Sequence, residues 1–538
     1  MLIAVITAVL LTGCSNSGGT TKKKVSSYEY GEDKTFHSDK PVTYTMMYSD
    51  NEAYPYKEDW LLWKEITKLS NVTLKLNIIA RSDYDDKKSL LINAGQSPYI
   101  IPKTYDETAF ITGGAILPIS DYTQYMPNYT AFVKKYHMED DLATITQNNG
   151  KYYRLPGMWE QALSDYSIVV RKDMFDKAGI DIKSLEKNLT WEEFAKILKK
   201  VQEANPGTIG LSDRWKGDAL LQTAGVEYDV TAGWGKNAPE IFNFDTKKFE
   251  FGPTTQRYKD FLSVFTGMMK DGTLDPESFT QEDDQALQKF YTGKSCAISA
   301  NRSTYPVMIS HMNQTLGKGN FELYMIVQPG SAEGNFYLPG NSRLENGIMI
   351  STNALTDLGK DGFIKMLRFI DWLWYSDKGQ TMVKWGVEGE TYRINDNGKK
   401  ELMPDIDYGG VHPDAEKKLN VDYGFSNGVF TYGGTKDLMI SMFSPLIADY
   451  CDRMYAMRTR RPLQPIAAGT EDEIESMNLI RTPLVDSVAS STLQFIMGQK
   501  DLTKDWDSYV ESCKEKGSDK LTTMSNLIYA RNHQTAKQ

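Results

Sequence analysis

The sequence has few of the residues that most catalytic and metal sites use. Only five of its 538 residues are His and four are Cys, and none stands at a zinc-binding spacing such as C-x-x-C or H-E-x-x-H. The motifs G-x-S-x-G, G-x-x-x-x-G-K-[ST] and, after an expected strand, G-x-G-x-x-G are missing as well. We therefore expect no metal, no cofactor and no catalytic residue.

An excess of positive charge is also missing. The chain has 61 Lys and Arg against 71 Asp and Glu, a formal net charge of −10, which disfavours binding to nucleic acid or to anionic lipid. With 40% hydrophobic residues the chain has enough apolar side chains to fold. Its length allows three or four domains of about 150 residues, or two large lobes built from several segments.

The longest N-terminal apolar run is too short to span a bilayer. It covers residues 2–11, apolar apart from Thr7, and is about half of the ~20 residues that a spanning helix needs. Leu11-Thr12-Gly13-Cys14 follows and resembles a bacterial lipobox. We expect a signal peptide at 1–13, a lipid on Cys14 and a flexible tether over 14–40. A basic n-region is missing, so we expect the natural start to lie upstream.

The other cysteines are Cys296, Cys451 and Cys513. Each stands among apolar residues or at a position where an apolar side chain would serve, so we expect buried, inert thiols. A bridge between Cys451 and Cys513 is the alternative.

Hydrophobic periodicity predicts an α/β protein. Residues 42–48 read as a strand, 57–69 as a helix with one apolar face, and 72–79 as an alternating strand. Such a unit implies parallel strands with a right-handed crossover, and ligands of open α/β sheets bind beyond the carboxyl ends of the strands. The polar and aromatic loop 49–56 is expected at that edge.

The same pattern recurs later in the chain. Further strands are expected at 165–171, 296–300, 321–327 and 347–351. Further helices are expected after the capping box Thr190–Glu193, at 258–269 and at 363–374, and residues from 436 onward show helical spacing. The prediction is an α/β fold with two sheet regions and a helical C-terminal region.

Aromatic side chains near the expected strand ends are the strongest candidate ligand contacts. Aromatic rings stack on the apolar faces of sugar rings, while Asp, Asn, Glu and Arg bond the hydroxyl groups. Any one of these rings could instead pack in the core. The candidate ligand-binding residues are Asp50, Asn51, Tyr54, Tyr56, Trp159, Glu160, Trp234, Arg302, Tyr305, Glu345, Trp385, Glu388 and Tyr392.

Two other kinds of site have weaker support. A glycoside hydrolase needs two carboxylates, and pairs such as Glu160 with Asp165 or Glu388 with Glu390 are available, but a solvated face or a hydrogen-bonding ligand contact is favoured for them. Asn395-Asp396-Asn397-Gly398 resembles the start of a calcium loop, but the ligand spacing fails and a surface turn is favoured.

Several segments, in a common order, resemble the extracellular solute-binding lipoproteins of bacterial ABC importers. The resemblance is to the maltose-binding-protein-like class, and within it to the long branch that includes alginate- and fructo-oligosaccharide-binding proteins. The segments that carry it are residues 91–100, where Tyr99 replaces the usual Asp, and residues 114–122, 149–156, 170–179, 290–298, 386–392 and 506–510.

This resemblance implies a two-lobed fold of the periplasmic-binding-protein type II, with discontinuous lobes. The implied first lobe comprises 41–153 plus 329–388, and the second 154–328 plus 389–538. It also implies that an oligosaccharide is captured between the lobes and delivered to the membrane permease of an ABC importer. The protein would be a monomer, held by its lipid on the extracellular face of the cytoplasmic membrane. A surface glycoside hydrolase, or a peptide-binding or sensor lipoprotein on the same scaffold, is the alternative.

Overall fold

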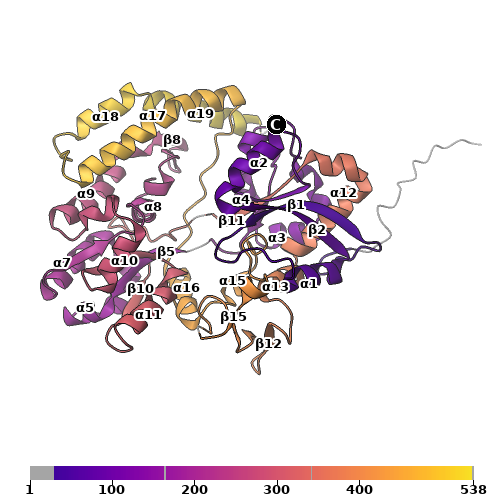
Figure 1. Cartoon of the computed structure of the whole chain (residues 1–538). Coiled ribbons are helices and arrows are strands. Elements are labelled where there is room, and N and C mark those ends of the chain that lie inside the picture. The colour runs from indigo at the N-terminus through magenta and orange to yellow at the C-terminus, as the bar shows by residue number, and fades with distance from the viewer. Residues whose placement is uncertain (1–29, 163–164, 341, 413, 536–538) are drawn as a thin grey trace, which may run out of the picture.

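The computed structural model describes residues 30–162, 165–340, 342–412 and 414–535. The expected signal peptide, Cys14 and the first part of the tether lie outside these residues. The described chain forms two α/β bodies, each built around its own sheet (Figure 1). We call them the first lobe and the second lobe. None of the helices in the described ranges is both long enough and apolar enough to cross a membrane.

The first lobe contains a five-stranded sheet in the order β2-β1-β3-β11-β4. Its strands are β1 (Val42–Asp50), β2 (Val72–Ala80), β3 (Ile100–Thr104), β4 (Leu155–Met158) and β11 (Leu344–Ile350). β1 pairs in parallel with β2 and β3, whereas β11 runs antiparallel to β3 and β4. The predicted strand, helix and strand are confirmed, with α1 (Leu61–Ser70) between β1 and β2.

Side chains that alternate along β1 fill both faces of this sheet. Met46 packs in the larger core with Trp372, while its neighbour Met47 packs in a smaller core on the other face with Tyr84 and Ile92. The helices of this lobe are α1, α2 (Tyr84–Asn93), α3 (Pro127–Lys135), α4 (Glu139–Ala143), α12 (Thr352–Tyr375) and α13 (Asp377–Trp385). Long apolar side chains on α12, predicted from their spacing, form much of the larger core.

The lobe boundaries predicted at 153 and 388 differ from the packing. β4 belongs to the first sheet, and side chains from Tyr392 to Met442 pack in the first core. The elements of this segment are short and its sequence is polar, so no local pattern assigns it to the first lobe. Its buried side chains pack in the core of that lobe. It contains β12 (Tyr392–Ile394), β13 (Lys400–Leu402), β14 (Ile406–Asp407), β15 (Lys417–Lys418), α14 (Leu419–Asp422) and α15 (Lys436–Ile440).

The second lobe contains a four-stranded sheet in the order β10-β5-β9-β6. Its strands are β5 (Tyr166–Arg171), β6 (Ile209–Ser212), β9 (Ser295–Asn301) and β10 (Leu323–Ile326), and a separate hairpin joins β7 (Glu240–Asn243) to β8 (Lys248–Phe251). Its earlier helices are α5 (Lys172–Lys177), α6 (Ile182–Leu185), α7 (Trp191–Ala204), α8 (Asp218–Glu227), α9 (Gln256–Lys270), α10 (Asp283–Tyr291) and α11 (Thr304–Thr315). The predicted cap of α7 is present, since Glu193 N donates to Thr190 Oγ1 at 3.2 Å.

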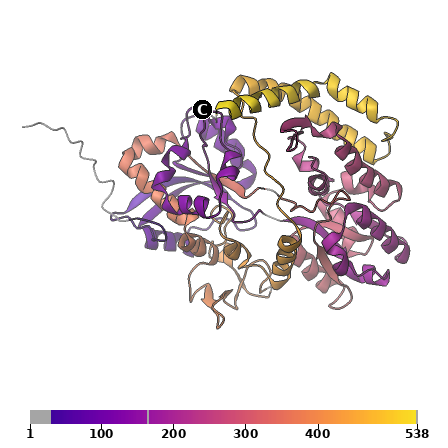
Figure 2. The ribbon, with the colours of Figure 1, turned by 180° about the vertical axis from the view of Figure 1, so that it is seen from behind.

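The predicted helical C-terminal region is confirmed. It comprises α16 (Pro445–Met457), α17 (Glu471–Ile496), α18 (Trp506–Glu515) and α19 (Ser518–Thr535). The last three pack on α9 and β8 of the second lobe, as both views of the ribbon show (Figures 1 and 2).

Cys296, Cys451 and Cys513 are buried free thiols, as predicted, so no Cys451–Cys513 bridge is formed.

A single buried carboxylate anchors the start of α3 to the core of the first lobe. Asp371 Oδ1 accepts from Tyr129 N at 2.8 Å, and Oδ2 accepts from Asn128 N at 3.0 Å and from the Tyr30 hydroxyl at 2.6 Å. Backbone N–H groups at a helix N-terminus have no partner within the helix, so this carboxylate supplies one.

We expect Asp371→Ala to destabilise the protein by about 3 kcal/mol, because it leaves several buried donors without an acceptor. Asp361→Ala is the matched control, since Asp361 is exposed on the same helix. Urea unfolding followed by circular dichroism measures both variants. Equal stability of the two would show that Asp371 does not anchor α3.

Candidate functional site

Three aromatic rings gather at one edge of the second sheet. β6 and β9 are parallel and end there, while the antiparallel β5 begins there, with Tyr166 opposite Asn301. The ring centroids of Tyr166 and Trp215 lie 5.4 Å apart, those of Tyr166 and Trp234 also 5.4 Å, and those of the two Trp residues 5.9 Å. We call these three residues the aromatic cluster. Trp234 is 44% exposed, so an apolar surface is open to a ligand.

Buried polar groups fix the loop that carries Trp215. Asp213 Oδ2 accepts from Trp215 N and from Gly217 N, each at 2.7 Å, and burial raises the pKa of this carboxyl. Arg214 bonds both carboxylate oxygens of Asp283, at 2.6 and 2.8 Å, and its guanidinium lies 4.7 Å from the centre of the Trp215 ring. The ring is therefore held in position before any ligand binds.

Polar side chains gather at the corresponding edge of the first sheet. β3 ends there and β11 begins there, and the register between them shifts at a bulge. Lys103, in this bulge, has a left-handed backbone with φ of 55°. Bulges of this kind redirect side chains next to functional sites.

The side chains at this edge are Lys103, Tyr105, Glu345 and Asn346, which we call the polar cluster. Lys103 Nζ lies 3.4 Å from the Tyr105 hydroxyl, and Asn346 Nδ2 donates to Glu345 Oε1 at 3.1 Å. Burial lowers the pKa of Lys103, and the charge of Glu345 acts in the opposite direction. Tyr105 is 59% exposed, so its hydroxyl is open to solvent, whereas Lys103 and Glu345 are partly buried.

Residues 159–160 lie where the chain crosses between the lobes. Trp159 N donates to Arg343 O at 2.8 Å and Glu160 N to Gly434 O at 3.1 Å, while Lys436 N donates to Glu160 Oε2 at 2.7 Å. These contacts hold the crossing segment in place.

Arg302 lies on the second-lobe side of this junction. Its Nε donates to Asp165 Oδ1 at 2.8 Å, and the guanidinium lies 4.9 Å from the ring centre of Phe443. Glu160 and Asp165, the carboxylates considered for a hydrolase, are thus each bonded within the protein.

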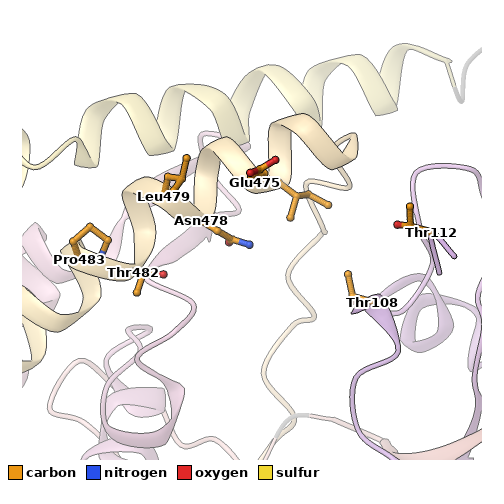
Figure 3. Close-up of a pocket in the computed structure, with 8 residues that line it drawn as sticks. Thr108, Thr112, Glu475, Asn478, Leu479, Thr482 and Pro483 are labelled. Carbon is orange, nitrogen blue, oxygen red and sulfur yellow. The ribbon is translucent and has the colours of Figure 1, made fainter. Parts of the chain in front are cut away.

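Two pockets lie between the first lobe and α17. The larger has a volume of about 660 Å³ and is lined by Thr108 and Thr112 of the first lobe, and by one face of α17 (Figure 3). The smaller, of about 380 Å³, adjoins it and includes Gln147, Asn148 and Asn149 of the first lobe. Both lobes therefore contribute walls to the same space.

The predicted residues after β1 lie on the first lobe at the same edge as the polar cluster. Their side chains stabilise the loop: Asp50 Oδ1 accepts from Tyr56 N at 2.7 Å, and Asn51 Oδ1 accepts from Ala53 N at 3.0 Å. The Tyr54 hydroxyl accepts from Gly428 N at 3.4 Å. Glu345 lies in the polar cluster and Trp234 in the aromatic cluster.

Three of the aromatic residues for which we expect ligand contact are buried in the core. Tyr305 and Trp385 are each 2% exposed, and Tyr392 is 7% exposed and packs on Trp385. The Tyr305 hydroxyl donates to Leu323 O at 3.1 Å, and Trp385 Nε1 to Ser441 Oγ at 3.1 Å. Their polar atoms are thus satisfied inside the core. Glu388 is exposed in the turn after α13, and the structure does not place it in either cluster.

Sequence reasoning missed Tyr166, Trp215, Lys103, Tyr105 and Asn346. All five stand within four residues of a strand end, and this position was the signal in the sequence that could have identified them.

The expected surface turn at 395–398 is confirmed, since it joins β12 to β13 and Gly398 N donates to Asn395 O at 2.8 Å. Over the described part of the chain, no three His, Cys, Asp or Glu side chains are grouped as a metal site requires.

Lys384 is a buried amine close to the junction of the lobes. Its Nζ donates to Leu438 O at 2.5 Å and to Met439 O at 3.2 Å. Burial, with a contribution from the charge of Arg302, lowers the pKa of Lys384 to about 7. The ordinary value is about 10.4.

We expect Lys384 to make stability rise with pH above about 7. Below that pH both folded and unfolded chains carry its proton, so the full penalty of burying the charge is present. Between about pH 7 and 10 the folded chain releases the proton and the unfolded chain keeps it, which favours folding. The free energy of unfolding of wild type relative to Lys384→Met should therefore increase over this range in urea titrations. Lys378→Met, an exposed change on the same helix, is the control, and identical pH profiles of the two variants would refute the expectation.

Part of the chain is similar to a family of known proteins. Residues 54–314 match the family model described as bacterial extracellular solute-binding protein. Lipoprotein LipO of Bacillus subtilis (strain 168) is 21% identical, over 97% of this chain and 97% of that protein. The polygalacturonan/rhamnogalacturonan-binding protein YtcQ of the same organism is 25% identical over 43% of this chain and 45% of its own.

The fold has a close counterpart among solved structures. The alginate-binding protein AlgQ2, crystallised without calcium ion, superposes with a TM-score of 0.66 at 18% identity, covering 93% of this chain and 100% of AlgQ2. Residues 54–314 are thus similar to bacterial extracellular solute-binding proteins, and the two-lobed α/β fold is similar to that of AlgQ2.

Proposed function

We propose that this protein captures an oligosaccharide between its two lobes and delivers it to the permease of an ABC importer. The observation that carries the proposal is the aromatic cluster on the second lobe, with the polar cluster on the first lobe as its counterpart. A sugar ring has apolar C–H faces and a rim of hydroxyl groups. One lobe offers a surface for the faces and the other offers donors and acceptors for the rim.

The printed names of the similar proteins support a carbohydrate ligand. YtcQ is described as binding polygalacturonan and rhamnogalacturonan, and AlgQ2 as binding alginate. All three are long sugar chains. We infer that this chain also takes an oligosaccharide, and that it binds its ligand without cleaving it, because Glu160 and Asp165 are bonded within the protein.

Binding would be coupled to movement of the lobes. We propose that the first lobe comprises residues 30–158 and 342–442, and the second 165–340 and 445–535, on the basis of the two sheets and their cores. A ligand that touches both lobes favours the closed state by the contacts made only there. The closed form would then dock on the permease as a monomer.

We propose that a lipid on Cys14 holds the protein on the extracellular face of the cytoplasmic membrane, after removal of residues 1–13. The lipobox and the flexible composition that follows it support this proposal. A tether raises the effective concentration of the binding protein near its permease.

The first prediction from this function concerns the aromatic cluster. In calorimetry against galacturonan, alginate and fructan oligosaccharides, we expect wild type to bind at least one series. Trp215→Ala and Trp234→Ala should each weaken that binding by about tenfold, or about 1.4 kcal/mol, because a stacking surface is lost. Phe244→Ala is the matched control, since Phe244 is an exposed aromatic residue of the second lobe outside the cluster.

Two results would count against the proposal. Absence of binding to every sugar would refute carbohydrate capture. Full affinity of both Trp variants would refute the assigned site while leaving the function in place.

The second prediction concerns attachment. We expect Cys14→Ser to release the protein from the membrane fraction into the medium, because the acceptor of the lipid is lost. Cell fractionation with immunoblotting measures this, and Cys296→Ser, which changes a buried thiol, is the control. A Cys14→Ser protein that stays with the membrane would show that the lipid is not its anchor.

A further inference from the structure

We propose that α17 forms a distal sugar-binding wall that holds the far units of a long oligosaccharide. The inference rests on the proposed function and extends it, because it assigns a second part of the site and a preference for chain length. The location is the pocket of about 660 Å³ between α17 and the loop that contains Thr108 and Thr112 (Figure 3). Ligand pockets typically measure about 300–1,000 Å³.

One face of α17 packs against the core of the second lobe, and another face, which we call the open face, lines the pocket. Met477, Leu484 and Val488 are buried against the second lobe. Glu475, Asn478, Leu479 and Thr482 share a different face, since they are spaced three and four residues apart, and all four line the pocket. Leu479 is 73% exposed, so the wall contains an apolar surface as well as an amide, a hydroxyl and a carboxylate.

The opposite wall has matching chemistry. Thr108 and Thr112 of the first lobe border the larger pocket, and the amides of Gln147, Asn148 and Asn149 border the adjoining one. Hydroxyl and amide groups both donate and accept hydrogen bonds, as sugar hydroxyls require. Asn478 and Thr482 point from α17 toward the space that the two Thr residues border on the other side (Figure 3).

Both walls are close in sequence to the clusters of the candidate site. On the first lobe, Thr108 follows Tyr105 by three residues, and its hydroxyl and N–H both donate to Asp106, at 2.6 and 2.9 Å. On the second lobe, Trp234 precedes the start of β7 by six residues, and there Arg481 of α17 bonds Glu240 at 2.6 Å. These links along the chain support the proposal that a long ligand on the aromatic cluster extends to α17.

Most contacts that dock α17 lie outside its open face, where Asn478 Oδ1 accepts from Arg481 Nη1 at 2.7 Å. Arg481 bonds Glu240, Tyr258 and Thr492 share a hydrogen bond of 2.7 Å, and Glu473 pairs with Arg531 of α19 at 2.6 Å. The ion pairs Arg481–Glu240 and Arg531–Glu473 and the Tyr258–Thr492 hydrogen bond all remain when Asn478 and Thr482 are replaced, so we expect the helix to stay docked. This makes a length-dependent binding test possible.

The test measures affinity for short and long members, from dimer to hexamer, of the galacturonan, alginate and fructan series. Asn478→Ala/Thr482→Ala should weaken binding of the hexamer about tenfold and leave the dimer unchanged, because only a long chain reaches α17. Asp486→Ala/Ser490→Ala is the matched control, since both residues are exposed on α17 and neither lines the pocket. Urea unfolding confirms that both double variants are folded.

The outcomes are separable. Wild-type protein that binds hexamer and dimer equally well, or a hexamer affinity that matches the control, overturns the distal wall and leaves the proposed function standing. Wild-type protein that binds no member of any series overturns the proposed function and the distal wall with it. A loss confined to the longer sugars supports both.

Discussion

The arrangement of the two lobes depends on one buried carboxylate. Asp141 of α4, whose side chain is 2% exposed, bonds Arg343 at 2.5 Å and also pairs with Arg460. Arg343 precedes β11, where the chain returns to the first lobe. Thr459, next to Arg460, is hydrogen-bonded to Phe336 and Leu338 of the second lobe. The ion pairs of Asp141 therefore join segments from both lobes, and a buried charge that bonds two guanidinium groups tolerates little displacement.

This junction links the two lobes that carry the aromatic cluster and the polar cluster. Each cluster stands at the edge of its own sheet where the parallel strands end, which is where open α/β sheets bind ligands. The position of each cluster follows from its sheet alone. Their relation to each other follows from the crossing segments, which are short and hydrogen-bonded on both sides, as at Trp159 and Glu160.

The sequence allowed the elements to be predicted better than the site. Alternation identified β1 and β2, and apolar spacing identified α1 and α12, because these patterns depend only on which face is buried. Trp385 and Tyr305 have neighbours as polar as those of Trp234, and only the tertiary packing makes the first two core residues. Likewise, the polar stretch after residue 389 joins the first core through scattered side chains such as Phe425 and Phe430. Such contacts between distant segments leave no local pattern.

The two clusters have different consequences for closure. The aromatic cluster lies on one lobe, so a sugar stacked on it gains the same free energy whether the lobes are open or closed, and this contact alone shifts no equilibrium. The polar cluster and the first-lobe wall can touch that sugar only when the lobes approach. Under the proposed function, their hydrogen bonds would supply the differential affinity that favours the closed state. Under this assignment the second lobe provides affinity for the sugar, and the first lobe provides the preference for the closed state. A ligand with a suitable ring face but misplaced hydroxyl groups would bind without closing the lobes.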